Sequence, residues 1–163
     1  MTDFEIKMCE HQADYFELSL TRFSCSSSIF ISTYMNSGIT KELDVVDDVY
    51  NYISPNNLMN AFAMKYPKLS EEGSIKYPTS VLRWIGYIYR AFSIITKKYS
   101  SEIYKELKAD KMLEYYNVFH TFDPDYCVER LLELINQNKE SFDDYEIYKK
   151  AFKEFEYIRD NRT

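Results

Sequence analysis

Residues 79–98 read TSVLRWIGYIYRAFSIITKK, and this run decides the fold because it is apolar on nearly every side. A helix that is apolar all round is normally buried at the centre of a domain. Arg83 and Arg90 are unusual there, since they lie seven residues apart and share one stripe. Gly86, at the midpoint, costs about 1 kcal/mol relative to alanine. We therefore expect a central helix that also presents an edge to a partner.

The composition around this run favours helices. Three glycines and four prolines are few for 163 residues, and the segments between them mix charged and apolar side chains. Such a chain is long enough to bury a core of its own, and it argues against a sandwich of many strands. We predict an all-α fold: a single domain over residues 1–163, built as an irregular bundle of about seven helices around the central one. A flexible connector is predicted near 68–77.

Cap residues place the other helices. Ser26 or Ser27 is expected to cap a helix over 29–36, and Gly38 is expected to end it with a positive φ. A helix over 4–20 is weakly indicated, and a short strand at its start is the alternative. Further helices are expected over 40–52, from Pro55 to about Tyr66, from Ser100 or Ser101 to Leu107, over 109–117, from Pro124 to Asn136 after an Asp123 cap, and from Ser141 or Asp143 to Ile158.

Charge is spread unevenly along the chain. The net charge is −6, but residues 76–120 hold 8 basic and 4 acidic side chains, whereas residues 1–75 and 121–163 are both acidic. Phosphate contacts need basic side chains, so an acidic chain is a poor general nucleic-acid binder. The basic middle leaves a local patch open, and the acidic ends suit solubility or a basic protein partner.

The three cysteines indicate a reducing compartment. Cys9, Cys25 and Cys127 are odd in number and far apart in sequence, so free thiols and a cytoplasmic location are expected. No signal peptide is expected, because the first ten residues carry three acids. Arg90 cuts the longest apolar run short of the roughly 18 residues that a membrane span needs. We therefore expect no contact with a membrane.

Sites for known chemistry are weakly indicated. His11 and His120 have no cysteine or carboxylate at ligand spacing, so neither a metal site nor another cofactor is expected. The three glycines are isolated, which excludes a glycine-rich phosphate loop. No nucleophile motif accompanies the histidines, and His120 is best explained as a structural residue at a helix junction. We therefore expect a binding protein rather than an enzyme.

The candidate contact residues are aromatic and basic. Trp, Tyr and Arg dominate the energetic hot spots of interfaces. Trp84, together with Ile85, Ile88 and Phe92, is expected to face inward, whereas Arg83, Tyr87 and Arg90 share a stripe that could face outward. Internal ion pairs between these arginines and acids of a neighbouring helix are an equally weighted alternative. Near the end of the chain Tyr145, Tyr148, Phe152 and Phe155 form a stripe that is either a core face or a partner face.

Several of these segments resemble a family of small helical proteins from bacterial operons of the toxin–antitoxin type. The similarity covers roughly residues 26–60 and 78–135, and the W-I-G-Y-x-Y-R pattern at 84–90 is its most specific part. The segments that carry it are IFISTYMNS at 29–37, VLRWIGYIYR at 81–90, SSEIY at 100–104, YYNVFHT at 115–121, DP at 123–124 and ERL at 129–131.

The resemblance implies a function but no catalytic residues. Such proteins lie beside a toxin gene, in some cases one for an ADP-ribosyltransferase-like toxin, and their implied role is that of an antitoxin. The motif positions in this chain are Trp84, Gly86, Tyr87, Tyr89, Arg90, His120, Thr121, Asp123 and Pro124.

We therefore expect an antitoxin-like protein that neutralises a cognate toxin by steric occlusion. The runner-up is a nucleic-acid-binding regulator that uses 76–111 as a helix-turn-helix, and a third class is an enzyme with a cryptic pocket that modifies nucleotides. The residues expected to bind the partner are Arg83, Trp84, Tyr87, Tyr89, Arg90, His120 and Tyr148.

Overall fold

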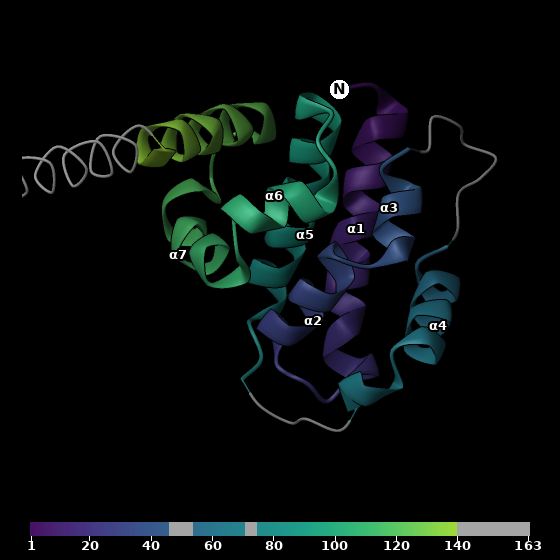
Figure 1. Ribbon diagram of the computed structural model, residues 1–163. Coiled ribbons are helices and arrows are strands. Elements are labelled where there is room, and N and C mark those ends of the chain that lie inside the picture. Colours follow the sequence, from purple (N-terminus) through teal and green to yellow (C-terminus); the bar gives the residue numbers. More distant parts are fainter. Residues whose placement is uncertain (46–53, 71–74, 140–163) are drawn as a thin grey trace, which may run out of the picture. The chain divides into compact units, whose positions relative to one another are not determined.

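Helix α5 lies against α1 along most of its length in the computed structural model, and these two helices form the most extensive pair (Figure 1). The structure describes residues 1–45, 54–70 and 75–139. Within these ranges it contains eight α-helices and no strand, which confirms the all-α prediction. The named elements are α1 Asp3–Arg22, α2 Ser27–Met35, α3 Gly38–Leu43, α4 Pro55–Lys65, the 3-10 helix η2 Pro67–Ser70, α5 Thr79–Thr96, α6 Ser100–Glu106 and α7 Ala109–Phe119.

By its internal contacts the chain divides into two compact units, residues 1–128 and 129–163. A further helix covers 124–139 and passes from the first unit into the second. In the described part of the second unit, Arg130 forms an ion pair with Glu133 one turn later. The single domain over 1–163 stays a prediction, and the expected last helix from Ser141 or Asp143 lies outside the described residues.

The helix starts follow local capping chemistry. Thr2 and Glu5 form a capping box at the start of α1, with Glu5 N donating to Thr2 Oγ1 at 3.2 Å and Thr2 N to Glu5 Oε2 at 2.7 Å. A capping box satisfies backbone donors that have no partner inside the helix. The T-x-x-E pattern therefore explains why a helix of 20 residues, rather than a strand, begins the chain.

Two capping predictions are confirmed. Ser26 caps α2 by accepting a hydrogen bond from Ile29 N at 3.2 Å. Asp123 precedes the helix that begins at Pro124, and its Oδ1 accepts from Asp125 N at 3.0 Å. Pro55 also stands at the first turn of α4, as expected from its missing N–H group.

Gly38 corrects an expectation. It does not end α2 with a positive φ: it is the first residue of α3, which Ser37 caps by accepting from Thr40 N at 3.2 Å. Helix α3 stops at Leu43, and residues 46–52 of the longer predicted helix lie outside the described residues. The left-handed residue is instead Lys97, with φ 58°, at the end of α5.

The aromatic content of the sequence fills the core of the first unit. Phe16 of α1 meets Phe30 and Tyr34 of α2 edge to face, with ring centroids 5.6 and 5.4 Å apart. Phe62 of α4 joins the same cluster, 5.7 Å from Phe30, and Tyr89 of α5 lies 6.3 Å from Phe16. Edge-to-face pairs add about 0.5–1.5 kcal/mol each beyond the burial of their area. Four helices are thus joined by one group of rings.

Gly86 is explained by the close approach of α1 and α5. A Cβ at this position would lie 2.7 Å from Gln12 O and 2.9 Å from the Phe16 ring. The Gly86 carbonyl in turn accepts a hydrogen bond from Gln12 Nε2 at 3.1 Å. The glycine therefore allows close backbone contact within the core, and does not indicate an edge for a partner.

Candidate partner-binding groove

Arg90 is a core residue, contrary to the prediction that it faces a partner. Only 2% of its side chain is exposed. Its Nη1 donates to Asp44 Oδ1 at 2.8 Å, while Nε and Nη2 donate to Gln12 Oε1 at 3.0 and 2.8 Å. The alternative of an internal ion pair is therefore confirmed for this arginine.

Asp44 joins Arg90 to two other elements. Its Oδ1 accepts from Ser100 Oγ at 2.7 Å and its Oδ2 accepts from Ser100 N at 2.7 Å, at the start of α6. Ser93 Oγ lies 3.4 Å from the same carboxylate and donates to Lys98 O at 2.8 Å. This buried network ties α1, α5, α6 and the end of α3 together. Removing one partner of such a network leaves a charge without compensation.

Tyr89 is also unavailable to a partner. Its side chain is fully buried, and its hydroxyl donates to Leu107 O at 2.6 Å. Burial raises the pKa of this phenol well above its ordinary value. The predicted contact role of Tyr89 is wrong because this face of α5 is covered by other helices.

Arg83 lies two turns before Arg90 and has a different environment. Its Nη1 donates to Asp14 Oδ1 at 2.7 Å and also contacts Glu17 Oε2, both on α1. These hydrogen bonds raise the pKa of the guanidinium. About two fifths of the Arg83 side chain is exposed (42%), so the pair lies at the surface. The internal ion pair is thus confirmed here too, and Arg83 remains accessible.

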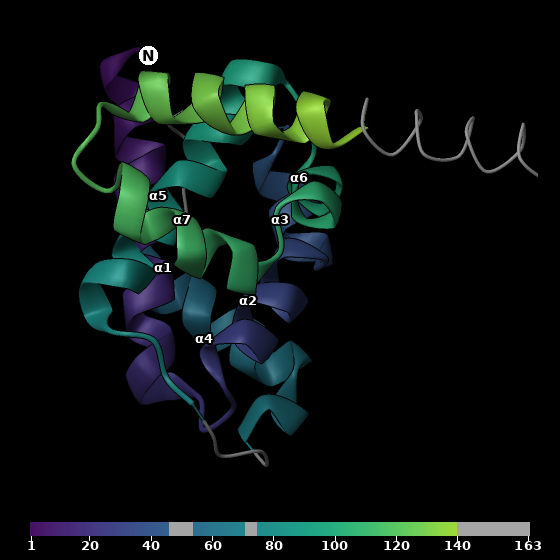
Figure 2. The same cartoon turned by 90° about the vertical axis from the view of Figure 1, so that its left-hand side faces the viewer.

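A shallow groove of about 280 Å³ runs beside Arg83. It lies in the first unit, where α1, α5 and the turn after α7 come together, and Figure 2 views the side of the molecule that carries α7. Four of the predicted contact residues border it. The lining residues are Glu10, Ala13, Arg83, Trp84, Tyr87, Ile88, His120, Phe122 and Pro124.

His120 and Trp84 are both held by Tyr116 of α7. The Trp84 ring meets Tyr116 edge to face at 5.6 Å, and the His120 ring stacks on Tyr116 at 4.6 Å. His120 Nδ1 lies 2.8 Å from Tyr116 O, so its N–H donates to that carbonyl. The histidine thus occupies the helix junction that the sequence predicts, yet its ring is exposed and reaches the groove.

Tyr87 lies in the groove with one acidic lining residue, Glu10, and feels two further acids electrostatically. Partial burial is the main cause of its raised pKa, and Glu10, Asp125 and Asp123 raise it further. All three carboxylates are on exposed residues. Each disfavours the phenolate because like charges repel. The groove is therefore an aromatic surface with a negative rim.

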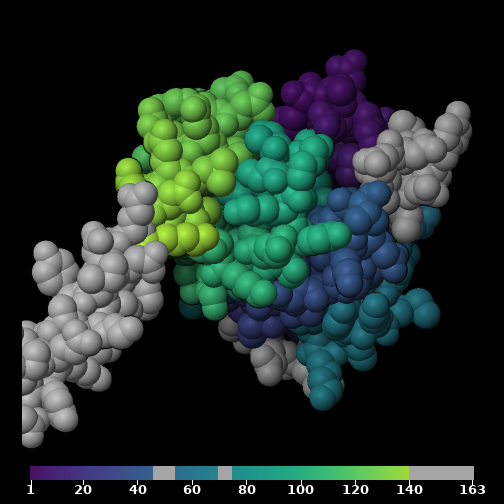
Figure 3. Space-filling model, turned by 45° about the horizontal axis from the view of Figure 1, so that its top comes forward, coloured from purple at the N-terminus to yellow at the C-terminus, as the bar shows by residue number. Residues whose placement is uncertain are grey.

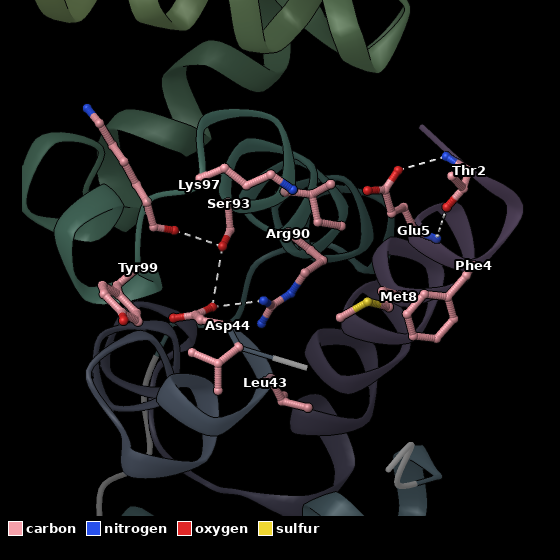
Figure 4. Close-up of a pocket in the computed structure, with 13 residues that line it drawn as sticks. Thr2, Phe4, Glu5, Met8, Leu43, Asp44, Arg90, Ser93, Lys97 and Tyr99 are labelled. Atoms are coloured by element: carbon pink, nitrogen blue, oxygen red, sulfur yellow. Dashed lines mark hydrogen bonds and ion pairs between the residues drawn. The ribbon is translucent and has the colours of Figure 1, made fainter. Parts of the chain in front are cut away.

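A second cavity, of about 350 Å³, lies over the Arg90–Asp44 network (Figure 4). Thr2, Glu5 and Met8 of the N-terminal segment face Lys97 and Tyr99 across it. Figure 3 shows this end of the first unit, where the start of α1, α3 and the α5–α6 region lie near one another. The polar groups at its floor already bond to one another, so this cavity offers less to a ligand than the groove.

Other predicted features have mixed outcomes. The three cysteines form no disulfide with one another and are buried, and burial raises the pKa of Cys9 to about 12. In the described ranges, no three histidine, cysteine or acidic side chains come together as a metal site would require. The same ranges contain no helix that is long and apolar enough to cross a membrane. Tyr148, the remaining predicted contact, lies outside the described residues.

Comparison with known proteins adds nothing to this geometry: no protein-family model, curated protein or solved structure matches the chain. The groove must therefore be interpreted from its own residues.

Sequence analysis missed part of the groove. Glu10 and Ala13 come from α1, some seventy residues before Trp84, and no motif connects them to it. Phe122 lies between the helix predicted over 109–117 and the one predicted from Pro124, and its 44% exposure is a feature of the tertiary structure. Pro124 is predicted as a helix start and is a motif position of the resemblance, but neither property indicates a groove residue. An acidic residue one turn before a small residue, as in Glu10 and Ala13, is too common a pattern to have indicated the site.

Proposed function

We propose that this chain is a protein-binding domain that engages its partner through the groove lined by Trp84, Tyr87 and Phe122. The supporting observation is that three rings are partly exposed around one hollow, whereas the rings of the Phe16 cluster in the core are buried. Exposed apolar patches with a polar rim are typical of interaction sites, and Trp and Tyr are enriched among their hot spots.

The partner surface should carry positive charge. Glu10 lines the groove, Asp123 and Asp125 raise the pKa of Tyr87, and the only guanidinium in the groove lining is paired with two carboxylates of α1. Such a rim accelerates encounter with a basic partner and disfavours acidic ones. The same charge argues against the alternative of a nucleic-acid regulator, because phosphates would be repelled at this face.

We further propose that the partner is a toxin encoded beside this chain and that binding neutralises it by occlusion. This part is supported by the resemblance of residues 26–60 and 78–135 to antitoxin-like proteins. A stable pair of this kind buries roughly 800 Å² on each partner. The groove would form the centre of the interface, and α1 and α7 would form its edges.

The test is expression of the neighbouring reading frames in a bacterial host, alone and together with this chain. A neighbour whose product arrests growth alone, and is harmless when this chain is present, supports the proposal. The variant Tyr87→Ala should weaken binding of the two purified proteins at least about tenfold, as removal of an interface ring commonly does.

Tyr99→Ala is the matched control. Tyr99 is 45% exposed before α6 and does not line the groove, so its replacement should leave binding and rescue unchanged. Neighbouring genes that are all harmless when expressed alone would overturn the antitoxin role. Equal effects of the two variants would overturn the groove as the binding site.

A further inference from the structure

The walls of the groove are suited to a cation. Trp84, Tyr87 and Phe122 present rings around one hollow of about 280 Å³. The faces of aromatic rings attract ammonium and guanidinium groups through their quadrupole, and Trp is the best of them.

The charges around the hollow have the complementary sign. Glu10 is exposed within the lining itself, and no ion pair is found for it among the described residues. Asp123 and Asp125 lie close enough to act on Tyr87. The positive charge of Arg83 is already paired with two carboxylates of α1, those of Asp14 and Glu17.

We propose that the groove receives one cationic side chain, arginine or lysine, from the partner protein. Its aliphatic stem would lie on Trp84, Tyr87 and Phe122, and its charged group would lie beside Glu10. This assignment rests on the proposed function and specifies the anchor that the partner supplies. An arginine or lysine fits both properties of the groove, since its stem is apolar and its end is charged.

The chain provides its own probe, because Trp84 is its only tryptophan. Tryptophan emission can therefore be followed while the full-length protein is titrated with short capped peptides. Four peptides differ at one central position, which holds arginine, lysine, citrulline or norleucine. Citrulline keeps the shape of arginine without its charge, and norleucine keeps the lysine stem without its ammonium group.

We expect the tryptophan emission to change and then saturate as the arginine or lysine peptide is added. The neutral counterpart of that peptide should bind at least threefold more weakly. The affinity should fall as salt is added, because exposed charges are screened. Glu10→Gln should lower the affinity for the cationic peptide about threefold to tenfold. The matched control is Glu114→Gln on α7, whose carboxylate pairs with Lys111 outside the groove and whose loss should change nothing.

Two results would overturn the assignment. One is norleucine or citrulline binding as tightly as the cations, with Glu10→Gln unchanged. The other is no change in emission with either cationic peptide even at tens of millimolar. The proposed function fails separately: if Tyr87→Ala still disrupts the complex with the toxin while Glu10→Gln has no effect, the groove is the interface but its anchor is not a cation.

Discussion

The two arginines of α5 lie two turns apart on one helix, and the structure gives them opposite environments. Arg90 is 2% exposed and is bound by Asp44 and Gln12, whereas the side chain of Arg83 is 42% exposed and is bound by Asp14 and Glu17. One end of the helix thus forms part of a buried network and the other borders the groove. The comparison teaches that a residue type on an apolar helix acquires its role from the neighbouring helices.

The largest effect is expected at the buried end. Arg90→Met should lower the free energy of unfolding by about 3–5 kcal/mol, because it leaves Asp44 buried without its cationic partner. Urea denaturation followed by circular dichroism measures this loss. Arg90→Lys keeps a charge but cannot bridge Asp44 and Gln12 in the same way. Its free energy of unfolding should therefore lie between those of the wild type and Arg90→Met. A loss below that of a typical surface variant would show that the network does not stabilise the fold.

Gly86→Ala should cost about 1–3 kcal/mol, although alanine is the better helix former. The added Cβ would lie 2.7 Å from Gln12 O, which is backbone and cannot simply move aside. The control is Gly38→Ala, where the nearest atom is the flexible Lys65 Nζ at 3.2 Å, and where little change is expected. Thermal and urea unfolding measure the stability of both variants. Equal stabilities of Gly86→Ala and Gly38→Ala would contradict the close contact of α1 with α5.

The free energy of unfolding should also fall at alkaline pH because Cys9 of α1 is buried. Burial raises the pKa of Cys9 from 9.0 to about 12, so the folded state favours the neutral thiol. Its contribution to stability is complete below pH 9 and is lost as the pH rises from 9 to 12. Cys9→Ser, which does not ionise there, should reduce the pH slope of the unfolding free energy by about 1 kcal/mol per pH unit. Identical slopes for the two proteins would place Cys9 in contact with solvent.

The smallest effect on stability is expected at the groove end. Arg83→Gln should change the unfolding free energy by less than about 1 kcal/mol, because exposed ion pairs contribute little. Urea titrations of this variant beside Arg90→Met test the comparison directly. If Arg83→Gln lowered the unfolding free energy as much as Arg90→Met, the two arginines would contribute equally to stability. The difference that we infer between their environments would then be wrong.

Much of the fold can be predicted from the sequence because the signals are local. The apolar run 79–98 predicts a central helix, Ser26 and Asp123 predict helix starts, and the small number of glycines and prolines predicts an all-α fold. The capping box at Thr2 and Glu5 is a local signal of the same kind, and it marks the start of α1. Gly38 misled the prediction because a glycine near two helix ends can stop one helix or begin the next.

Four of the nine residues that line the candidate groove can be predicted from the sequence. Arg83, Trp84, Tyr87 and His120 are predicted from residue type, helix stripe and the resemblance, and they do border one groove, although Trp84 is also expected to face inward. Arg90 and Tyr89 were predicted on the same grounds and are buried, since Asp44, Gln12 and Leu107 O are brought to them from distant elements. Periodicity identifies the stripes of a helix, but not which stripe a neighbour covers.

The order and type of the elements were thus determined by the sequence itself, through apolar periodicity and helix caps that act within a few residues. The tertiary structure alone decided that Gly86 is a contact point, that Arg90 is an interior cation, and that Glu10 and Trp84 line one groove. The physical reason is the distance along the chain over which each interaction acts. Backbone hydrogen bonds and caps act over one turn of helix, whereas burial and charge pairing depend on helices that meet only when the whole chain has folded.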